Sequence, residues 1–455
     1  MRPHRRLSLT VGSALVLLIS GCGDASSAER AGAPTAAAPA GLVALPVAVP
    51  AGLAGAPFDE PRQVLAPPGW SMSLWARVPG ARLAAWTPDG ALLVSRPGAG
   101  QVVRLAPGSS GQVTASVLLD GLDQPHGLAF DGTTLYVAES DQVDAYTYAA
   151  GATTGRRTVA GGLPDAKSAE LGGAYAHALK TVTIGPDRSI YYSVGSTGNI
   201  SGEDRDADPQ RAVIMRIPPG GGAPAVFARG VRNGTGLAIA PDGAVWTAVN
   251  NRDNIEYPHD RSYSGGSGAG SDSDLGEVVA DYVADHPVEE LARLTPGRDL
   301  GWPYCNPDGD VQPGVPGTAV NHTAPKFVVD VQTNPGGGEL DCAALAPVEQ
   351  TFGAHSAPLG LSVLTGATLP APYTEGALVG IHGSWNRTPP RAPEVSFFPW
   401  VNGTFGPQRT LVGGFQAADG SRWGRPVAAV QGPDRAVYIT DDSAGAVYRL
   451  VPPGR

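Results

Sequence analysis

The chain contains 455 residues, of which 62 are glycine and 43 are proline, while only 16% are charged. This abundance of turn-forming residues argues against helical bundles and coiled coils, and it favours an all-β fold of many short strands. The net charge of −10 argues against a nucleic-acid partner. Three cysteines without a Cys-x-x-Cys pair argue against a disulfide scaffold, an iron–sulfur cluster or covalent haem.

Residues 1–21 have the features of a secretion signal, with a basic start, an apolar stretch over 11–19 and small residues at 20–21. The run Leu18-Ile19-Ser20-Gly21-Cys22 resembles a bacterial lipobox, which implies that Cys22 becomes a lipidated N-terminal residue. We therefore expect an exported protein on the periplasmic or cell-surface side of a bacterial membrane. The N-terminal lipid would be its only contact with that membrane. The alternative is an ordinary cleaved signal in which the cysteine is coincidental.

Residues 22–57 consist mostly of Ala, Gly, Pro, Val and Ser, a composition that predicts a flexible tether without a core. The folded domain is then expected to cover 58–455. Outside the cytoplasm Cys305 and Cys342 meet oxidising conditions, and with Cys22 lipidated they form the remaining pair. We predict a disulfide between them, and the alternative is two inert buried thiols.

A turn followed by a short alternating strand recurs six times along the domain. The six units cover 87–95, 131–138, 185–194, 241–249, 374–381 and 432–440. Asp-Gly turns between apolar alternating runs predict hairpins, and a repeat of roughly 40–55 residues is the blade period of a β-propeller. The sequence therefore predicts a six-bladed β-propeller.

The long gap between Asp242 and Glu375 predicts a loop insertion between blades four and five, and such insertions often cover a binding face. The last strand, 446–450, could pair with the N-terminal part of the domain and close the ring. A propeller supplies a central channel with loops converging at its mouth, but this scaffold does not name a function.

Six motifs carry a resemblance to a known family. They are the segments 177–195 (HALKTVTIGPDRSIYYSVG), 232–237 (RNGTGL), 301–305 (GWPYC), 354–361 (AHSAPLGL), 382–387 (HGSWNR) and 423–427 (WGRPV). Together they resemble the soluble quinoprotein glucose/sorbosone dehydrogenases, especially the sorbosone-dehydrogenase-like branch. The likeness covers roughly 65–450. It implies a six-bladed propeller that uses pyrroloquinoline quinone (PQQ) and calcium. It also implies oxidation of an aldose or sugar aldehyde to a lactone or acid, with electrons passed to an external acceptor, a quinone or a cytochrome.

The resemblance also assigns roles to single residues. His177 matches the family's catalytic base, and Arg232 matches the arginine that contacts the quinone oxygens and stabilises the charge that develops there. Asn233 would hydrogen-bond a cofactor oxygen, and Arg425 matches an arginine on a PQQ carboxylate. Such cations suit PQQ because it carries three carboxylates.

Further positions complete the expected site. The carbonyls of Asn251 and Arg252 fall where the family presents backbone oxygens to calcium. Arg387 is expected to supply the charge of a family lysine, while His126 and Trp385 are candidates for contact with the sugar. The chain departs from the glucose enzymes at Val427, where they carry a second arginine.

Two other functions remain open at this stage. A calcium-dependent lactonase of the gluconolactonase type is also a six-bladed propeller, but it needs Glu, Asn and Asp side chains on one metal in the channel. The matched positions His177, Arg232 and Arg425 suit an anion instead. The third possibility is a non-catalytic propeller that binds a glycan or a protein.

Overall fold

The computed structural model describes residues 41–108, 112–168, 171, 173, 175–263, 273–364, 366 and 369–454. The signal segment and Cys22 lie outside these residues, so their predicted roles stay predictions. Within the described ranges, no helix is both long enough and apolar enough to cross a membrane.

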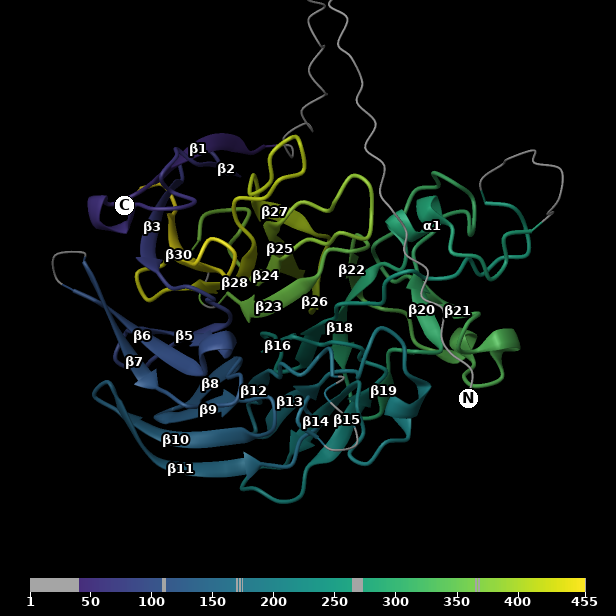
Figure 1. Cartoon of the computed structure of the whole chain (residues 1–455), viewed down its shortest axis with the longest axis horizontal. Helices are drawn as coiled ribbons and strands as arrows, with labels where there is room; N and C mark the ends of the chain where they lie inside the picture. The colour runs from purple at the N-terminus through teal and green to yellow at the C-terminus, as the bar shows by residue number, and fades with distance from the viewer. Residues whose placement is uncertain are drawn as a thin grey trace, which may run out of the picture. The chain divides into compact units, whose positions relative to one another are not determined.

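Six antiparallel sheets form the six predicted blades (Figure 1). Blade one contains β4 (Ala84–Trp86), β5 (Leu92–Arg96), β6 (Gln101–Pro107) and β7 (Val113–Leu119). Blade two contains β8 (Gly127–Asp131), β9 (Thr134–Ala138), β10 (Val143–Ala149) and β11 (Ala152–Ala160). Blade three contains β12 (Val182–Ile184), β13 (Ile190–Val194), β14 (Val213–Ile217) and β15 (Ala225–Arg229), with β19 (Arg298–Asp299) parallel to β15.

Blade four contains β16 (Gly236–Ile239), β17 (Val245–Ala248), β18 (Glu289–Leu294) and β22 (Gln350–Phe352). Blade five contains β23 (Pro358–Val363), β24 (Gly376–Ile381), β25 (Glu394–Val401) and β27 (Arg409–Val412), with β26 (Thr404–Phe405) beside β25. Blade six contains β28 (Pro426–Gln431), β29 (Val437–Asp441), β30 (Ala446–Val451) and β3 (Ser71–Arg77).

Each predicted turn joins the first and second strands of one blade, which explains why it repeats. Gly90 and Gly243 take the positive φ that such turns require, at 79° and 83°. In the two Gly-Pro-Asp-Arg turns the positive φ falls on Arg188 and Arg435 instead. The first strands β4, β8, β12, β16, β23 and β28 lie next to one another in this order, and β28 returns to β4. They surround a small cavity of about 70 Å³ that residues from all six strands line.

The apolar core lies between neighbouring blades. Blades four and five, for example, share a cluster in which buried Trp246 packs against Phe405 and Phe352 packs against Phe398. Similar clusters join blades two and three and join blades six and one. This sheet-on-sheet packing leaves the channel mouth to polar residues that precede the inner strands.

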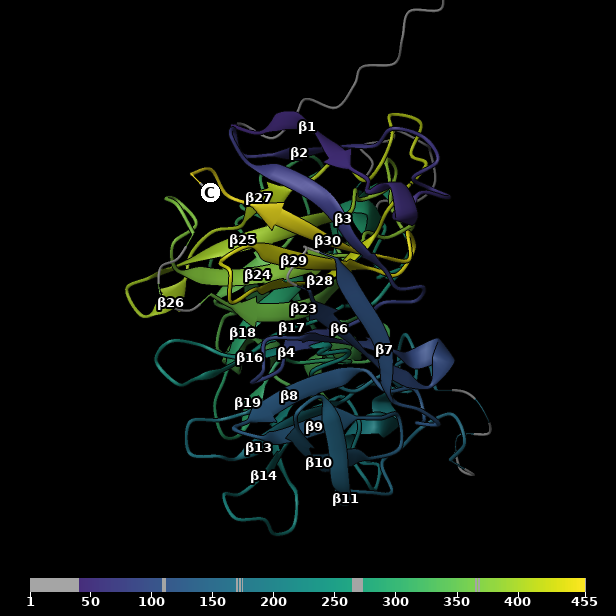
Figure 2. The same cartoon turned by 90° about the vertical axis from the view of Figure 1, so that its left-hand side faces the viewer.

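Blade six confirms that the last strand closes the ring. β3 pairs antiparallel with β30 in a register that runs from Ser71 opposite Val451 to Arg77 opposite Ala446. Figure 2 shows β1 (Val43–Ala48) and β2 (Gln63–Ala66) next to β3 at the edge of this blade. Because β1 pairs with β2 and with β3, the tether predicted to reach residue 57 is wrong for 43–57. Backbone pairing orders this stretch although its side chains are small.

The long gap after Asp242 holds two excursions within blade four, at 249–288 and 295–349, rather than one insertion between blades four and five. They carry helix α1 (Ala280–Asp285) and the hairpin of β20 (Cys305–Asp308) and β21 (Lys326–Val329), which lie together on one side of the blades in Figure 1. Cys305 and Cys342 form the predicted disulfide, with Cα atoms 5.6 Å apart.

Candidate active site

Polar side chains precede the inner strand of every blade. In blade order they are Arg82, His126, His177, Arg232, His355 and Arg425. Because the inner strands start at the same end of the channel, these segments meet at one mouth. We call them the lead-in segments. Contacts between them divide the mouth into two polar clusters.

His177 belongs to the first cluster and is held in one tautomer. Its Nδ1 lies 3.1 Å from the carbonyl oxygen of Ser196 and 2.8 Å from Ser196 Oγ, and this hydroxyl donates to Gly198 O. A carbonyl oxygen can only accept, so Nδ1 carries the proton and Nε2 keeps its lone pair. Burial and the charge of Arg232 lower the pKa of His177 to about 3. The imidazole is therefore neutral at neutral pH, and its unprotonated Nε2 is a weaker base than that of a free histidine.

Close backbone approach positions this ring. A Cβ atom on Gly195 would lie 2.6 Å from both the Cβ and the carbonyl oxygen of His177. Asn233 also borders this space, because its Oδ1 lies 3.4 Å from the same point. Only glycine at 195 leaves room for the histidine where it stands.

Arg232 is buried and donates to four oxygens of the chain itself. Nη1 donates to the carbonyls of Asn250 at 3.0 Å and Asn251 at 2.7 Å, while Nε and Nη2 donate to Asn199. Burial lowers the pKa of Arg232 to about 10, so the guanidinium keeps its charge at neutral pH. A carbonyl oxygen has two lone pairs, which leaves Asn251 O able to face a second positive group.

Asp253 contacts several other residues of the first cluster. Its carboxylate accepts from Asn386 Nδ2 at 3.2 Å and lies 3.4 Å from His355 Nδ1, while its backbone N–H donates to Asn199 Oδ1. Burial acts to raise the pKa of Asp253, but His355 and Arg232 hold it below its usual range. His355 and Ala357 both have positive φ, at 59° and 49°. Left-handed backbone at residues other than glycine is uncommon and often marks a functional site.

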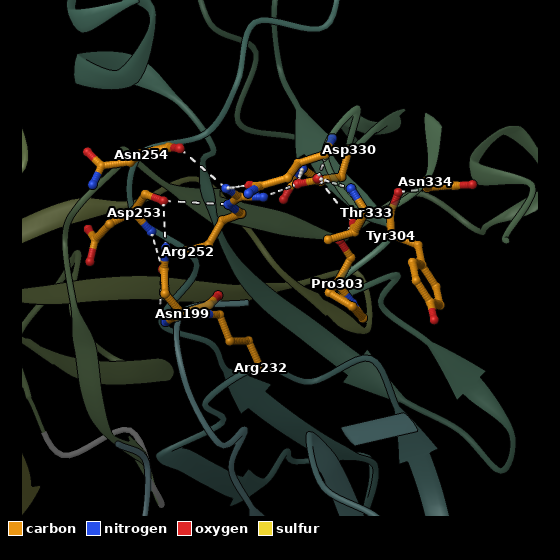
Figure 3. A network of polar contacts seen from close by, with 12 residues as sticks. Asn199, Arg232, Arg252, Asp253, Asn254, Pro303, Tyr304, Asp330, Thr333 and Asn334 are labelled. Atoms are coloured by element: carbon orange, nitrogen blue, oxygen red, sulfur yellow. Dashed lines mark hydrogen bonds and ion pairs between the residues drawn. The ribbon is translucent and has the colours of Figure 1, made fainter. Parts of the chain in front are cut away.

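Arg252 links this cluster to the excursions of blade four (Figure 3). Its side chain is buried and forms an ion pair with the buried carboxylate of Asp330, while Nη2 donates to Gln332 Oε1 at 3.0 Å. Figure 3 shows Asn199 between Arg232 and Asp253, with Arg252 extending away toward Asp330. The Arg252 guanidinium is thus structural, and only its carbonyl is left for the predicted calcium role.

Two buried carboxyl groups, Glu289 and Glu290, flank Asn251. Glu290 accepts from Asn251 Nδ2 at 2.9 Å, and Glu289 accepts from the Asn251 N–H at 3.3 Å. Burial raises the pKa of Glu290 to about 8 and raises that of Glu289 well above its usual value. When either acid ionises, its charge makes the electrostatic potential at the Asn251 carbonyl more negative.

The second cluster joins blades five, six and one. Asp442 pairs with Arg82 at 2.8 Å and with His382 Nε2 at 2.8 Å. Burial acts to raise the pKa of Asp442, but the hydrogen bond and charge of His382, together with Arg82, hold it at about 2. Arg425 donates from Nε and Nη2 to the carbonyls of His382 and Gly383 at 2.9 and 2.7 Å. These two bonds hold its half-buried guanidinium against the segment that follows the second strand of blade five.

A protein-family comparison matches the TrAA12-like family over residues 64–452. The chain belongs to the TrAA12-like family. This is a family of PQQ-dependent sugar dehydrogenases, so the resemblance seen in the sequence and the predicted enzyme class are confirmed.

Solved structures support the propeller fold of this TrAA12-like chain. The holo form of the pyranose dehydrogenase PQQ domain from Coprinopsis cinerea is 20% identical, with a TM-score of 0.67, over 89% of this chain and 100% of that one. The calcium structure of a family AA12 enzyme from Trichoderma reesei is 22% identical, with a TM-score of 0.67, over 85% and 96%. The PQQ-bound aldose sugar dehydrogenase from Streptomyces coelicolor is 15% identical, with a TM-score of 0.50, over 85% and 99%.

One curated protein also matches a part of the chain. It is an uncharacterized protein from Borreliella burgdorferi that is 32% identical over 99 residues, which make up 21% of this chain and 26% of that protein. The chain thus spans about a quarter of that relative's length.

The structure brings most of the predicted site residues to the mouth, but Arg387 is engaged outside the two clusters. Arg387 donates to Pro389 O and pairs with Asp285 on α1, whereas its neighbour Asn386 joins the cluster around Asp253. Trp385 on the same loop is 70% exposed. His126 is fully buried, and its Nδ1 donates to Lys180 O at 3.1 Å, so Nε2 carries the lone pair. This Nε2 has no hydrogen-bond partner among the described residues.

Sequence reasoning did not assign roles to several polar residues of the clusters. These are Arg82, Asn199, Asp253, Glu289, Glu290 and Asp442. Asp253 had a usable signal, because it ends the Asn250-Asn251-Arg252-Asp253 run already noted for calcium. The others are polar residues outside the motifs, and contacts between strands or between blades bring them to the mouth.

Proposed function

We propose that this chain oxidises an aldose or sugar aldehyde to the lactone or acid, using PQQ and calcium at the channel mouth and passing electrons to an external acceptor. The observation that carries the proposal is the neutral His177 with its free Nε2 beside Arg232. Family membership and the PQQ-bound and calcium-bound relatives support the choice of cofactors.

The donor set fits the cofactor chemically. PQQ carries three carboxylates, and the lead-in segments carry the guanidinium groups of Arg232, Arg425 and Arg82, of which Arg82 is paired with Asp442. His126 adds a buried polar nitrogen whose partner is missing among the described residues. A buried polar atom without a hydrogen-bond partner lowers the stability of the fold unless a ligand forms the missing bond.

Calcium would bind the carbonyl oxygens of Asn251 and Arg252, because it takes oxygen ligands and tolerates backbone carbonyls. The buried carboxyls of Glu289 and Glu290 lie next to Asn251, and a bound cation would favour their ionised forms, whose charge would offset its repulsion by Arg232. Val427 is buried, in agreement with the loss of a second arginine at this position.

When bound, PQQ supplies an ortho-quinone that accepts hydride from the sugar carbon. His177 takes the hydroxyl proton on Nε2 as the carbon–hydrogen bond breaks, and its Nδ1–H stays on the Ser196 carbonyl and hydroxyl. Ser196 therefore keeps the imidazole in the tautomer that can accept the proton. Arg232 is placed to stabilise negative charge beside the reacting group.

Sugar contacts are proposed for Trp385 and His126. Trp385 stands exposed next to Asn386, which ties its loop to Asp253, so its ring is available for stacking on a pyranose face. We also propose that Cys22 anchors the protein by lipid to a bacterial membrane, on the periplasmic or cell-surface side. A quinone or cytochrome would then accept the electrons.

Reconstitution tests the proposal. Purified full chain is titrated with PQQ in the presence and absence of calcium, and quinone absorption and dye reduction are followed with a panel of sugars. His177→Asn should retain PQQ but lose about 10²–10⁴-fold in turnover. The control is His322→Asn, because His322 contacts Thr351 through Nδ1 and is not one of the lead-in histidines.

Each outcome separates the competing functions. Binding of PQQ with no effect of His177→Asn on turnover would remove the assigned base. Failure to bind PQQ or oxidise any sugar would overturn the dehydrogenase. Lactone hydrolysis that depends on calcium would then favour the lactonase, and glycan binding without turnover would favour a binding propeller.

A further inference from the structure

A second cluster of metal-ligating side chains lies outside the channel mouth, in the excursions of blade four. His286 follows the last residue of α1, Asp308 ends β20, and Asp310 stands two residues later. One ligand atom from each of the three lies within 4.8 Å of the other two. His286 Nε2 is 3.0 Å from Asp310 Oδ1 and 3.9 Å from Asp308 Oδ1.

This cluster is buried and its histidine is oriented. All three side chains are at most 9% exposed. His286 Nδ1 lies 2.9 Å from the Tyr282 carbonyl, so it donates a proton there and turns Nε2 toward the two carboxylates. Asp308 and Asp310 also receive the N–H groups of Asp310 and Gly314, which fixes their positions. A divalent cation in the place of the Nε2 proton would contact the imidazole and both carboxylates.

Two further polar groups point to a missing ligand. Tyr282 is fully buried and stacks on the His286 ring at 4.0 Å, yet its hydroxyl has no hydrogen-bond partner in the described ranges. Burial raises the pKa of Tyr282 well above its usual value, and the charges of Asp308 and Asp310 raise it further, as expected for a phenol near both carboxylates. His259 Nε2 is likewise buried without a partner among the described residues.

The surroundings leave access to the cluster. His259, Asp308 and Asp310 line a cavity of about 560 Å³. Gly314, whose N–H donates to Asp310, is so close to the His259 ring that an added Cβ would meet His259 Cδ2. His259 therefore borders the same site from the opposite side of the excursion.

We propose that His286, Asp308 and Asp310 bind a divalent transition-metal ion, zinc in particular, and that the His259 side chain moves to become the fourth ligand. Imidazole nitrogen together with carboxylate oxygen suits zinc, whereas calcium takes six to eight oxygens. A tetrahedral ion about 2.0–2.1 Å from its ligands holds them about 3.3–3.4 Å apart. The observed separations of 3.0 and 3.9 Å bracket this spacing.

The ion would stiffen the excursions beside the channel mouth. α1 contacts the mouth directly, because His355 Nε2 donates to the Val283 carbonyl at 2.6 Å and His355 also contacts Asp253. An ion on His286 would anchor the C-terminal end of this helix to the β20–β21 hairpin. Its role is structural, and it does not require PQQ.

Metal content tests the proposal directly. Full chain without a polyhistidine tag is stripped with a chelator, dialysed against zinc or against calcium, and analysed by mass spectrometry of the elements. We expect one zinc per chain and no calcium at this site. Asp310→Asn and His286→Gln should weaken zinc binding at least tenfold. Asp281→Asn, an exposed acid on the same helix, should keep one zinc.

Cobalt provides a readout independent of the variants. Cobalt bound by nitrogen and oxygen in a four-coordinate site should give strong visible absorption in the unmutated chain, and zinc should abolish it. Circular dichroism identifies variants that fail to fold, and His259→Gln then serves as the folded alternative. Absence of bound zinc and of the cobalt band overturns the proposal. So does zinc retained by Asp310→Asn but lost by Asp141→Asn, which would place the ion at the acidic cluster of Asp123, Asp141 and Asp165.

Discussion

Gly195→Ala is predicted to disable the site by displacing His177 without touching any charged group. The added Cβ would lie 2.6 Å from the Cβ and the carbonyl oxygen of His177. Ordinary contact needs at least 3.4 Å, so the histidine must move by about 1 Å. Gly195 does not have positive φ, which means that alanine brings crowding and no backbone strain.

The size of the effect follows from this displacement. A misplacement of about 1 Å at a reacting group can cost about 10²-fold in rate, which corresponds to roughly 2.7 kcal/mol in the activation barrier. Overpacking should also lower the free energy of unfolding by about 1–3 kcal/mol. Turnover is measured by dye reduction in PQQ-loaded protein, and stability is measured by denaturant unfolding.

Gly198→Ala is the matched control, because a Cβ at this position meets no atom within 4 Å. It keeps the Gly198 carbonyl that accepts from Ser196 Oγ. The control should retain both turnover and stability. Wild-type turnover in a PQQ-loaded Gly195→Ala protein would refute the reasoning, since the base would then tolerate the shift.

Three other predictions concern stability and location. Replacing Cys305 and Cys342 by serine should lower the free energy of unfolding by about 3–4 kcal/mol, because the bridge closes a loop with a sequence separation of 37; equal denaturation midpoints under reducing and oxidising conditions would contradict this. Burial lowers the pKa of His126 from 6.5 to about 3 in the folded chain. Between pH 3 and pH 6.5 His126 therefore binds a proton only in the unfolded state, so the free energy of unfolding rises with pH over this range. Acidification from pH 6.5 to pH 5 should therefore cost about 2 kcal/mol, measured by denaturant unfolding, and His126→Asn should lose that share of the slope. Cys22→Ser should move the protein from the membrane to the soluble fraction, and retention after a high-salt wash would contradict the lipid anchor.

The fold was predictable because its signals are local. An Asp-Gly turn and the strand after it occupy about ten residues, so the first hairpin of each blade can be predicted independently of the rest of the chain. The position of β1 was not predictable in this way. Its Ala-, Val- and Pro-containing sequence pairs through backbone groups with a strand that composition does not reveal.

The site was predictable only where residues stand within motifs. His177, Arg232 and Arg425 precede inner strands and match family positions, and the structure places all three at the mouth. Arg387 and Asn386 are adjacent and their side chains make different contacts. The resemblance placed a family lysine near both, and charge favoured Arg387 over the amide that contacts Asp253. Contacts such as Asp442 with Arg82 join opposite ends of the chain and exist only after ring closure.

Ring closure by β3 and β30 also constrains how the chain can fold. β3 comes early and β30 comes late in the described chain, so blade six cannot close until residues 446–451 have been synthesised. Until then β3 and β29 present unpaired edges, and such edges are open to pairing with other chains. A copy that ends before residue 446 would keep both edges exposed. Its natural partner would be the β30 strand of an intact copy, which makes domain-swapped association the expected fate of C-terminal truncation.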